Sequence, residues 1–347
     1  MLDRLGIALP VVQAPMAGVQ DSKLALAVAN AGGLGSIPGA MLDPEALRAE
    51  LAVLAAGTTQ PFNVNFFCHG PPRPDASRER AWRSALAPYF AELGLDPEAA
   101  STGAARAPFS HAAADVLAEF RPAVVSFHFG LPAPDLLGRV RSWGSTIFSS
   151  ATTVDEARWL EAHGADVIIA QGLEAGGHRG HFLSDDLDRQ MGTLALVPQI
   201  VRAVDLPVIA AGGIADAAGV TAALALGAAA VQVGTAYLLC PEATTSAVHR
   251  AALTGDAART TALTNLISGR PARGVVNRIM RELGPMSPLP PSFPLAAGAI
   301  GPLRAAAERL GRGDFSPLWA GQNVTGCRAE PAAEVTRALS DTRGLRS

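Results

Sequence analysis

The sequence predicts an α/β protein, a (β/α)8 TIM barrel with a second, mainly helical domain. Eight short apolar runs alternate with amphipathic stretches, and such runs are typical of parallel strands that are covered on both faces. The 347 residues suffice for one barrel of roughly 250 residues and a smaller unit. An open doubly wound sheet is the alternative, but it would normally carry G-x-G-x-x-G after its first strand. Here Ala14-Pro15-Met16-Ala17-Gly18 follows instead.

The predicted strands share continuous apolar character and end at glycines or polar residues. In order they are residues 11–14, 34–37, 61–67, 123–127, 146–149, 167–170, 207–211 and 230–233. The first helix begins at the N-cap residue Asp21 and ends at Gly32-Gly33. Further helices are predicted at residues 44–55, 155–163, 194–204 and 217–226.

Two stretches interrupt the alternation and suggest the division into domains. Pro71, Pro72 and Pro74 open an insertion after the third strand, and a helical pattern follows the eighth strand. We expect the last residues to form a polar, solvated helix. The predicted parts are a barrel at 1–67 and 116–240, an insertion at 68–115, a helical domain beside the barrel mouth at 241–325 and a C-terminal tail at 326–347.

Composition excludes several classes of function. The 28 basic and 31 acidic residues leave a net charge of −3, which gives no electrostatic footprint for nucleic acid. Lys23 is the sole lysine, so a P-loop is absent and Schiff-base chemistry is disfavoured. Cys68, Cys240 and Cys327 are far apart in the sequence, which disfavours a disulfide framework or a cysteine-ligated metal.

The expected setting is the cytoplasm. Three sparse cysteines suit a reducing compartment, and the N-terminus lacks the long apolar run of a signal peptide. The apolar stretch 220–240 is interpreted as a helix and a buried strand, so no contact with a membrane is expected. His178 and His181 have no third ligand nearby, so we expect no metal. The expected oligomeric state is a monomer or a homodimer.

Glycines after the seventh and eighth strands predict a phosphate site. The carboxyl ends of barrel strands form the active face. Gly212 and Gly213 follow the seventh strand, and Gly234 and Thr235 follow the eighth. Their backbone N–H groups can approach an anion, and the helix that starts near Asp216 adds a positive dipole end.

Two histidines at the same face are candidates for catalysis. His178 lies in the glycine-dense loop after the sixth strand, with Gln171 and Gly176, and an imidazole can act there as acid, base or donor. His128 ends the fourth strand between phenylalanines, which would lower its pKa and favour the neutral ring. A buried core histidine is the competing interpretation for His128. The residues alone do not tell which of His178 and His128 dominates catalysis.

Two weaker signals fit a flat ligand. The loop that contains Met16 could lie over a planar ring, and Asn63 and Asn65 lie on one face of the third strand, where their amides could bond a heterocycle edge.

Taken in their order along the chain, the segments around Met16, Asn65, His128, His178, Gly213 and Gly234 resemble those of the nitronate monooxygenase family, formerly called 2-nitropropane dioxygenases. The similarity spans roughly residues 10–240, extends to the segment 319–322, and is most specific in the Ala-Gly-Gly-His-Arg-Gly loop that contains His178. It implies a TIM barrel with a helical second domain and non-covalent FMN. Gly212, Gly213, Gly234 and Thr235 would hold the phosphate, Asn65, Gln171, Gly176 and Met16 would line the flavin, His178 would be the active-site residue, and His128 would lie beside the substrate.

The resemblance implies an FMN-dependent oxidation of alkyl nitronates, such as propionate 3-nitronate, by O2. The Ser-Phe-His-Phe-Gly segment at 126–130 resembles the first class of the family. Members often carry a lysine near the site in the C-terminal half; here Arg273 and Arg278 are the candidates to replace it. The alternatives are an NAD(P)H-dependent FMN reductase of an enoyl thioester or quinone, and a non-catalytic flavin-binding module.

Overall fold

The computed structural model describes residues 1–96 and 106–341, and its centre is a closed parallel barrel. The strands run in the order β1-β9-β8-β6-β5-β4-β3-β2, and a parallel bridge between Val12 and Leu34 joins the two ends. All eight predicted strands and the predicted fold class are confirmed. The strands are β1 (Val11–Gln13), β2 (Gly35–Pro38), β3 (Phe62–Phe67), β4 (Val124–His128), β5 (Thr146–Ala151), β6 (Val167–Gln171), β8 (Val208–Ala211) and β9 (Ala230–Val233).

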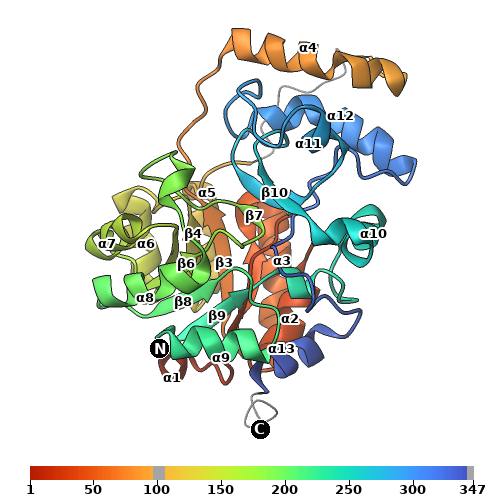
Figure 1. Cartoon of the computed structure of the whole chain (residues 1–347). Helices are drawn as coiled ribbons and strands as arrows, with labels where there is room; N and C mark the ends of the chain where they lie inside the picture. The colour runs from red at the N-terminus through yellow and green to blue at the C-terminus, as the bar shows by residue number, and fades with distance from the viewer. Residues whose placement is uncertain (97–105, 342–347) are drawn as a thin grey trace.

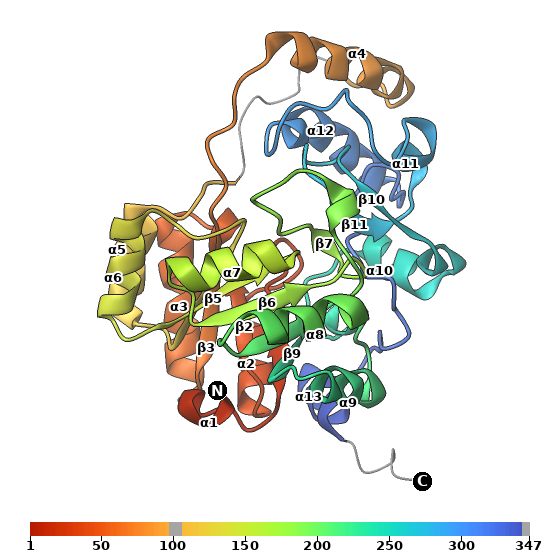
Figure 2. The same ribbon diagram turned by 60° about the vertical axis from the view of Figure 1, so that its left-hand side comes forward.

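Helices surround the barrel (Figures 1 and 2). Their apolar faces pack on the outer side of the strands, and capping side chains begin several of them: Asp21 accepts from the Lys23 amide, as predicted, and Asp216 accepts from the Gly219 amide. The short helix α1 (Leu2–Leu5) packs beneath the barrel interior. The outer helices are α2 (Ser22–Asn30), α3 (Pro44–Gly57), α5 (His111–Phe120), α6 (Pro134–Ser142), α7 (Val154–His163), α8 (Thr193–Ala203) and α9 (Ala217–Ala225).

A second core lies above the carboxyl ends of the strands. Helix α4 (Ala76–Glu92), from the insertion, packs on α12 (Ala296–Arg309), and Figure 2 shows the two helices side by side. Trp82 and Leu303 are among the buried residues between them. The insertion and the C-terminal region therefore share one hydrophobic core. The proposed limits of the insertion and of the tail include residues 97–105 and 342–347, which lie outside the described residues.

The region after the barrel is mainly helical, and it also contains two short strands that the sequence did not predict. It contains α10 (Ala247–Thr254) and α11 (Arg278–Glu282), but also the antiparallel strands β10 (Thr261–Thr264) and β11 (Ala272–Val275). β11 pairs in turn with β7 (Gly177–His178), which belongs to the loop after β6. Short strands of four residues that pair with distant partners leave little periodic signal in a sequence. This pairing ties the loop of His178 to the second region.

The expectation of a solvated C-terminal helix is wrong. Helix α13 (Ala332–Ser340) packs against α2 and α9, and Figures 1 and 2 both show it beside α9. Val335 and Leu339 are buried, and the hydroxyls of Thr336 and Tyr237 lie 2.9 Å apart. The spacing of these residues is that of one buried helical face. No helix in the described part of the chain combines the length and hydropathy needed to cross a membrane.

Candidate active site

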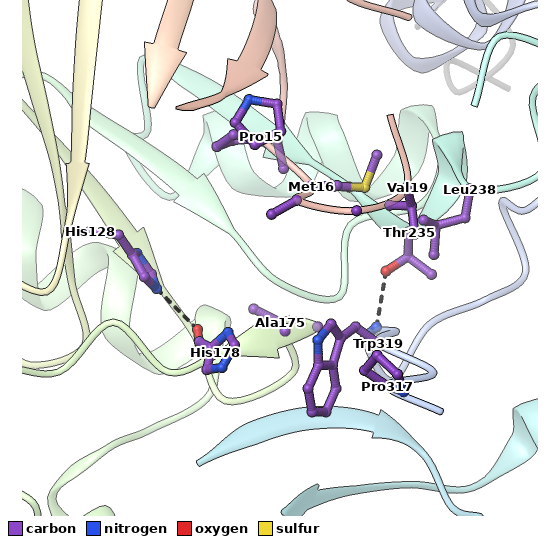
Figure 3. A pocket seen from close by; sticks show the side chains of 18 of the residues that line it. Pro15, Met16, Val19, His128, Ala175, His178, Thr235, Leu238, Pro317 and Trp319 are labelled. Carbon is purple, nitrogen blue, oxygen red and sulfur yellow. Dashed lines mark hydrogen bonds between the residues drawn. The ribbon is translucent and has the colours of Figure 1, made fainter. Parts of the chain in front are cut away.

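A cavity of about 230 Å³ opens at the carboxyl ends of the barrel strands. Loops after β1, β6, β8 and β9 and the segment 316–323 surround it (Figure 3). The structure brings ten of the residues that the sequence predicted to this one cavity, whereas Asn63 does not line it and donates to Ser36 Oγ at 3.0 Å. The predicted residues that line it are Met16, Asn65, His128, Gln171, Gly176, His178, Gly212, Gly213, Gly234 and Thr235.

One wall has the composition of an anion site. Gly212 and Gly213 have φ angles of +122° and +73°, in the left-handed region that favours glycine. Their amides, and that of Gly234, donate to no acceptor among residues 1–96 and 106–341. The segment 321–323 closes this wall, because the Gly321 amide donates to Thr235 Oγ1 at 2.9 Å and Asn323 Nδ2 donates to the Gly213 carbonyl at 3.0 Å. Free amides beside the start of α9 suit a phosphate.

The neighbouring wall suits a flat heterocycle. The Met16 amide donates to Gln20 Oε1 at 2.7 Å, which pins the loop after β1 over the cavity. Asn65 Nδ2 donates to Ser126 Oγ at 3.0 Å. The buried Gln232 Oε1 has no hydrogen-bond partner in the described residues, so it is an unsatisfied acceptor that an N–H or hydroxyl of a ligand would satisfy. The residues present therefore fit FMN.

Gln171 lines the cavity, and its side-chain amide is engaged within the loop that carries His178. Nε2 donates to the His178 carbonyl at 3.0 Å and Oε1 accepts from the Gly180 amide at 2.8 Å. Both ends of the side-chain amide are thus used within the loop after β6. Gln171 fixes the path of the backbone that carries His178.

The ring of His178 has an assignable tautomer. Nε2 lies 2.9 Å from Ser268 Oγ, and the Ser268 hydroxyl donates to the Arg270 carbonyl at 3.3 Å. Since that hydroxyl has one proton, Nε2–H donates to Ser268, and Nδ1 carries the lone pair. The ring packs against Phe293 and Trp319, with centroids 5.3 and 5.6 Å away. Burial, and then the positive charge of Arg106, lowers the pKa of His178 well below its usual value, so the ring is neutral.

His128 lies behind the His178 loop and is engaged at both nitrogens. Nε2 lies 3.2 Å from the His178 carbonyl, the contact dashed in Figure 3, and Nδ1 lies 3.0 Å from Ser150 Oγ. A carbonyl only accepts, so Nε2–H donates and Nδ1 accepts from Ser150. Burial lowers the pKa of His128 to about 3, in the direction that its aromatic flanks predicted. The side chain is therefore a neutral brace for the backbone at His178.

The two arginines proposed as replacements for a lysine do not line the cavity. Arg273 Nε donates to the Leu173 carbonyl at 2.7 Å, and Arg278 pairs with Glu92 and Glu282 at 2.8 Å. Arg106 and Arg304 line the cavity instead.

Sequence reasoning also missed other residues near His178. Arg106, and Trp319 beside the His178 ring, lie in irregular segments that no periodic pattern marks. Ser268 precedes β11, and only the pairing of β11 with β7 brings it to the histidine. Among residues 1–96 and 106–341, no cluster of three or more histidine, cysteine, aspartate or glutamate side chains is placed to hold a metal ion.

Comparison with known proteins identifies the family of this chain. The family model described as nitronate monooxygenase matches residues 1–340. A nitronate monooxygenase of Paraburkholderia phytofirmans is 45% identical over 342 residues, which cover 98% of this chain and 93% of that protein. One of Pseudomonas aeruginosa is 46% identical over 337 residues, 96% of each chain. A crystal structure of nitroalkane oxidase from Streptomyces ansochromogenes superposes with a TM-score of 0.90 at 38% identity, covering 100% of this chain and 99% of that one.

Proposed function

The chain belongs to the nitronate monooxygenase family and is an oxidoreductase of that class, and we propose that it uses FMN to oxidise alkyl nitronates with O2. The observation that carries the proposal is that free glycine amides and a half-buried, neutral histidine line the same cavity. Propionate 3-nitronate is the substrate that we propose for testing.

The proposed FMN site uses two walls of the cavity. The amides of Gly212, Gly213 and Gly234 would bind the phosphate, which needs donors and no bulky side chain. Thr235 would border it, and Met16, Asn65 and Gly176 would line the ring. One phosphate wall without a dinucleotide fingerprint favours FMN over FAD. Bound FMN would supply the oxidation and reduction chemistry.

His178 would handle the proton. A nitronate is already deprotonated at carbon, so its oxidation requires no strong base. A neutral nitroalkane must first lose that proton, and the lone pair on Nδ1 of His178 could take it. His128 and Gln171 would act as positioning residues, because each donates to the His178 carbonyl.

Aromatic side chains around His178 would keep water from the reacting atoms. Phe67, Phe129 and Phe293 are buried and pack on one another, with Phe67 and Phe129 centroids 4.9 Å apart. A dry site strengthens the electrostatic contacts of an anionic substrate.

Two measurements test this function. Mass spectrometry of the cofactor released from purified protein should find FMN; FAD, or no flavin after expression in flavin-replete cells, would contradict the cofactor. The protein should consume O2 with propionate 3-nitronate in the absence of NADH. Rapid anaerobic bleaching of the yellow protein by NADH, without nitronate oxidation, would instead support the reductase alternative.

We also propose that the protein works in the cytoplasm as a monomer or homodimer. Cys68, Cys240 and Cys327 are all free thiols, as a reducing compartment requires. Burial raises the pKa of each thiol, so none is poised as a thiolate. Fractionation of the source cells and light scattering of the purified holoprotein are the tests.

A further inference from the structure

Arg106 is a half-buried cation that no acidic group among the described residues balances. It follows the insertion helix α4 in the chain and lines the cavity. Its Nε is buried without a hydrogen-bond partner, and no ion pair joins it to any residue in the described ranges 1–96 and 106–341. The guanidinium carbon lies 5.9 Å from the ring centre of Phe293.

The other arginines near the cavity have partners. Arg304 Nε donates to Glu308 Oε1 at 2.8 Å. Arg270 lies 4.2 Å from the ring centre of Phe129 and donates to the His181 carbonyl. Burial lowers the pKa of Arg270 to about 10, and the nearby negative charges of Asp185 and Glu156 oppose that shift. Arg106 has a cation, Arg304, as its charged neighbour. The two positive charges repel each other, so Arg304 lowers the pKa of Arg106 and does not balance its charge.

The remaining groups around Arg106 do not supply a negative charge. Burial lowers the pKa of His69 to about 4, and the charge of Arg106 lowers the pKa of both His69 and His178 further. A largely desolvated guanidinium without a counter-charge is costly, so an anionic ligand in the cavity would stabilise it. The free amides of Gly212, Gly213 and Gly234 already suit the phosphate of FMN, which leaves Arg106 available for a different anion.

We propose that Arg106 is a specificity-determining residue, whose guanidinium binds a carboxylate at the non-reacting end of the nitronate substrate. This inference rests on the proposed function. Arg106 and His178 both line the cavity and both lie beside Phe293: the His178 ring centre is 5.3 Å from the Phe293 ring centre, and the Arg106 guanidinium carbon is 5.9 Å from it. A short dianion in the cavity can therefore present one charged end to Arg106 while its reacting end lies at His178. Arginine and carboxylate form the paired, charge-assisted hydrogen bonds that such recognition uses.

The first test compares two substrates of the holoenzyme. Propionate 3-nitronate carries the carboxylate, and propyl-1-nitronate has a methyl group in its place. We expect Arg106→Met to lower kcat/KM for propionate 3-nitronate by about tenfold to a hundredfold, mainly through KM, and for propyl-1-nitronate by less than about threefold. Arg106→Lys should recover part of the loss. Arg278→Met removes the same charge from an ion pair away from the cavity and should leave both substrates unaffected.

The second test measures binding without turnover. Succinate has the shape of propionate 3-nitronate with a carboxylate in place of the nitronate group, and butyramide has a similar length without a carboxylate. Calorimetric titration of the holoprotein should show that succinate binds at least tenfold more tightly than butyramide, and that Arg106→Met removes this preference.

The outcomes separate the two claims. An equal loss on both nitronates, or a succinate preference that survives in Arg106→Met, overturns the role of Arg106. Absence of turnover of either nitronate by the wild-type protein contradicts the proposed function instead, and the succinate titration still decides whether Arg106 binds a carboxylate.

Discussion

Replacing Gly213 with aspartate tests the phosphate site directly. The residue has a φ angle of +73°, and a Cβ atom there would lie 3.2 Å from Glu174 Cβ, so any side chain meets some strain. Asparagine tolerates positive φ and has the shape of aspartate without its charge. Gly213→Asn therefore measures the steric cost alone, and the difference between Gly213→Asp and Gly213→Asn isolates the charge.

The electrostatic effect can be worked from the position of Gly213 in the phosphate wall. A carboxylate about 4 Å from a phosphate charge is repelled by roughly 1 kcal/mol in water and about 4 kcal/mol at the effective dielectric of a protein surface. The site is partly enclosed, so we expect about 2–4 kcal/mol. That energy corresponds to a loss of FMN affinity of roughly 30-fold to 1000-fold relative to Gly213→Asn.

Fluorescence titration of the apoprotein with FMN gives the two dissociation constants, and urea unfolding of both apoproteins shows whether the barrel is equally stable. Added salt should narrow the gap between the variants, because it screens exposed charges. Gly213→Asp binding FMN within threefold of Gly213→Asn would refute the placement of the phosphate at Gly213.

Three further predictions follow from the described contacts. His178→Asn should keep FMN and lose turnover a hundredfold or more with neutral nitroalkane but less with nitronate, measured as O2 consumption; equal losses would make His178 a donor and not a base. His181 and His249 are buried with pKa values of about 4, so the unfolded chain takes up protons below pH 6.5 that the folded protein does not. The free energy of unfolding, measured with urea, should therefore fall as pH decreases from 6.5 toward 4, by on the order of 1–2 kcal/mol per histidine at pH 5. His249→Gln should make this pH dependence less steep. Leu339→Ala should cost about 2–4 kcal/mol in the same assay and Leu310→Ala, at an exposed side chain, under about 0.5 kcal/mol; equal small effects would mean that α13 does not pack as described.

The barrel was predictable because each parallel strand is buried on both faces. That burial requires continuous apolar runs, and the turns after them require glycine, so both leave a local mark in the sequence. The same reasoning placed Gly212, Gly213 and Gly234 together, since strand ends meet at one face of a barrel. Helix α13 shows the limit: its apolar positions were visible, but the surface that covers them, on α2 and α9, is set by tertiary packing.

The remaining parts of the site depend on contacts between distant segments. Ser268 bonds His178 across 90 positions of the chain, and Arg106 reaches the cavity from an irregular segment. Neither has a spacing that a periodicity argument could use. Arg273 and Arg278 were plausible candidates by charge and sequence position, but each has backbone or carboxylate partners elsewhere.

The charge states around the cavity favour a substrate that arrives as an anion. Burial keeps His128 and His178 neutral, so neither ring adds a positive charge that would have to be compensated in the free protein. The positive charge of Arg106 instead stays unpaired in the described chain. In the proposed binding mode the carboxylate at the far end of the substrate balances that charge, both for a nitroalkane and for a nitronate. A neutral nitroalkane would also need His178 as a base, and its strongly lowered pKa makes it a weak one. A nitronate needs no such proton transfer, so the site favours the deprotonated form.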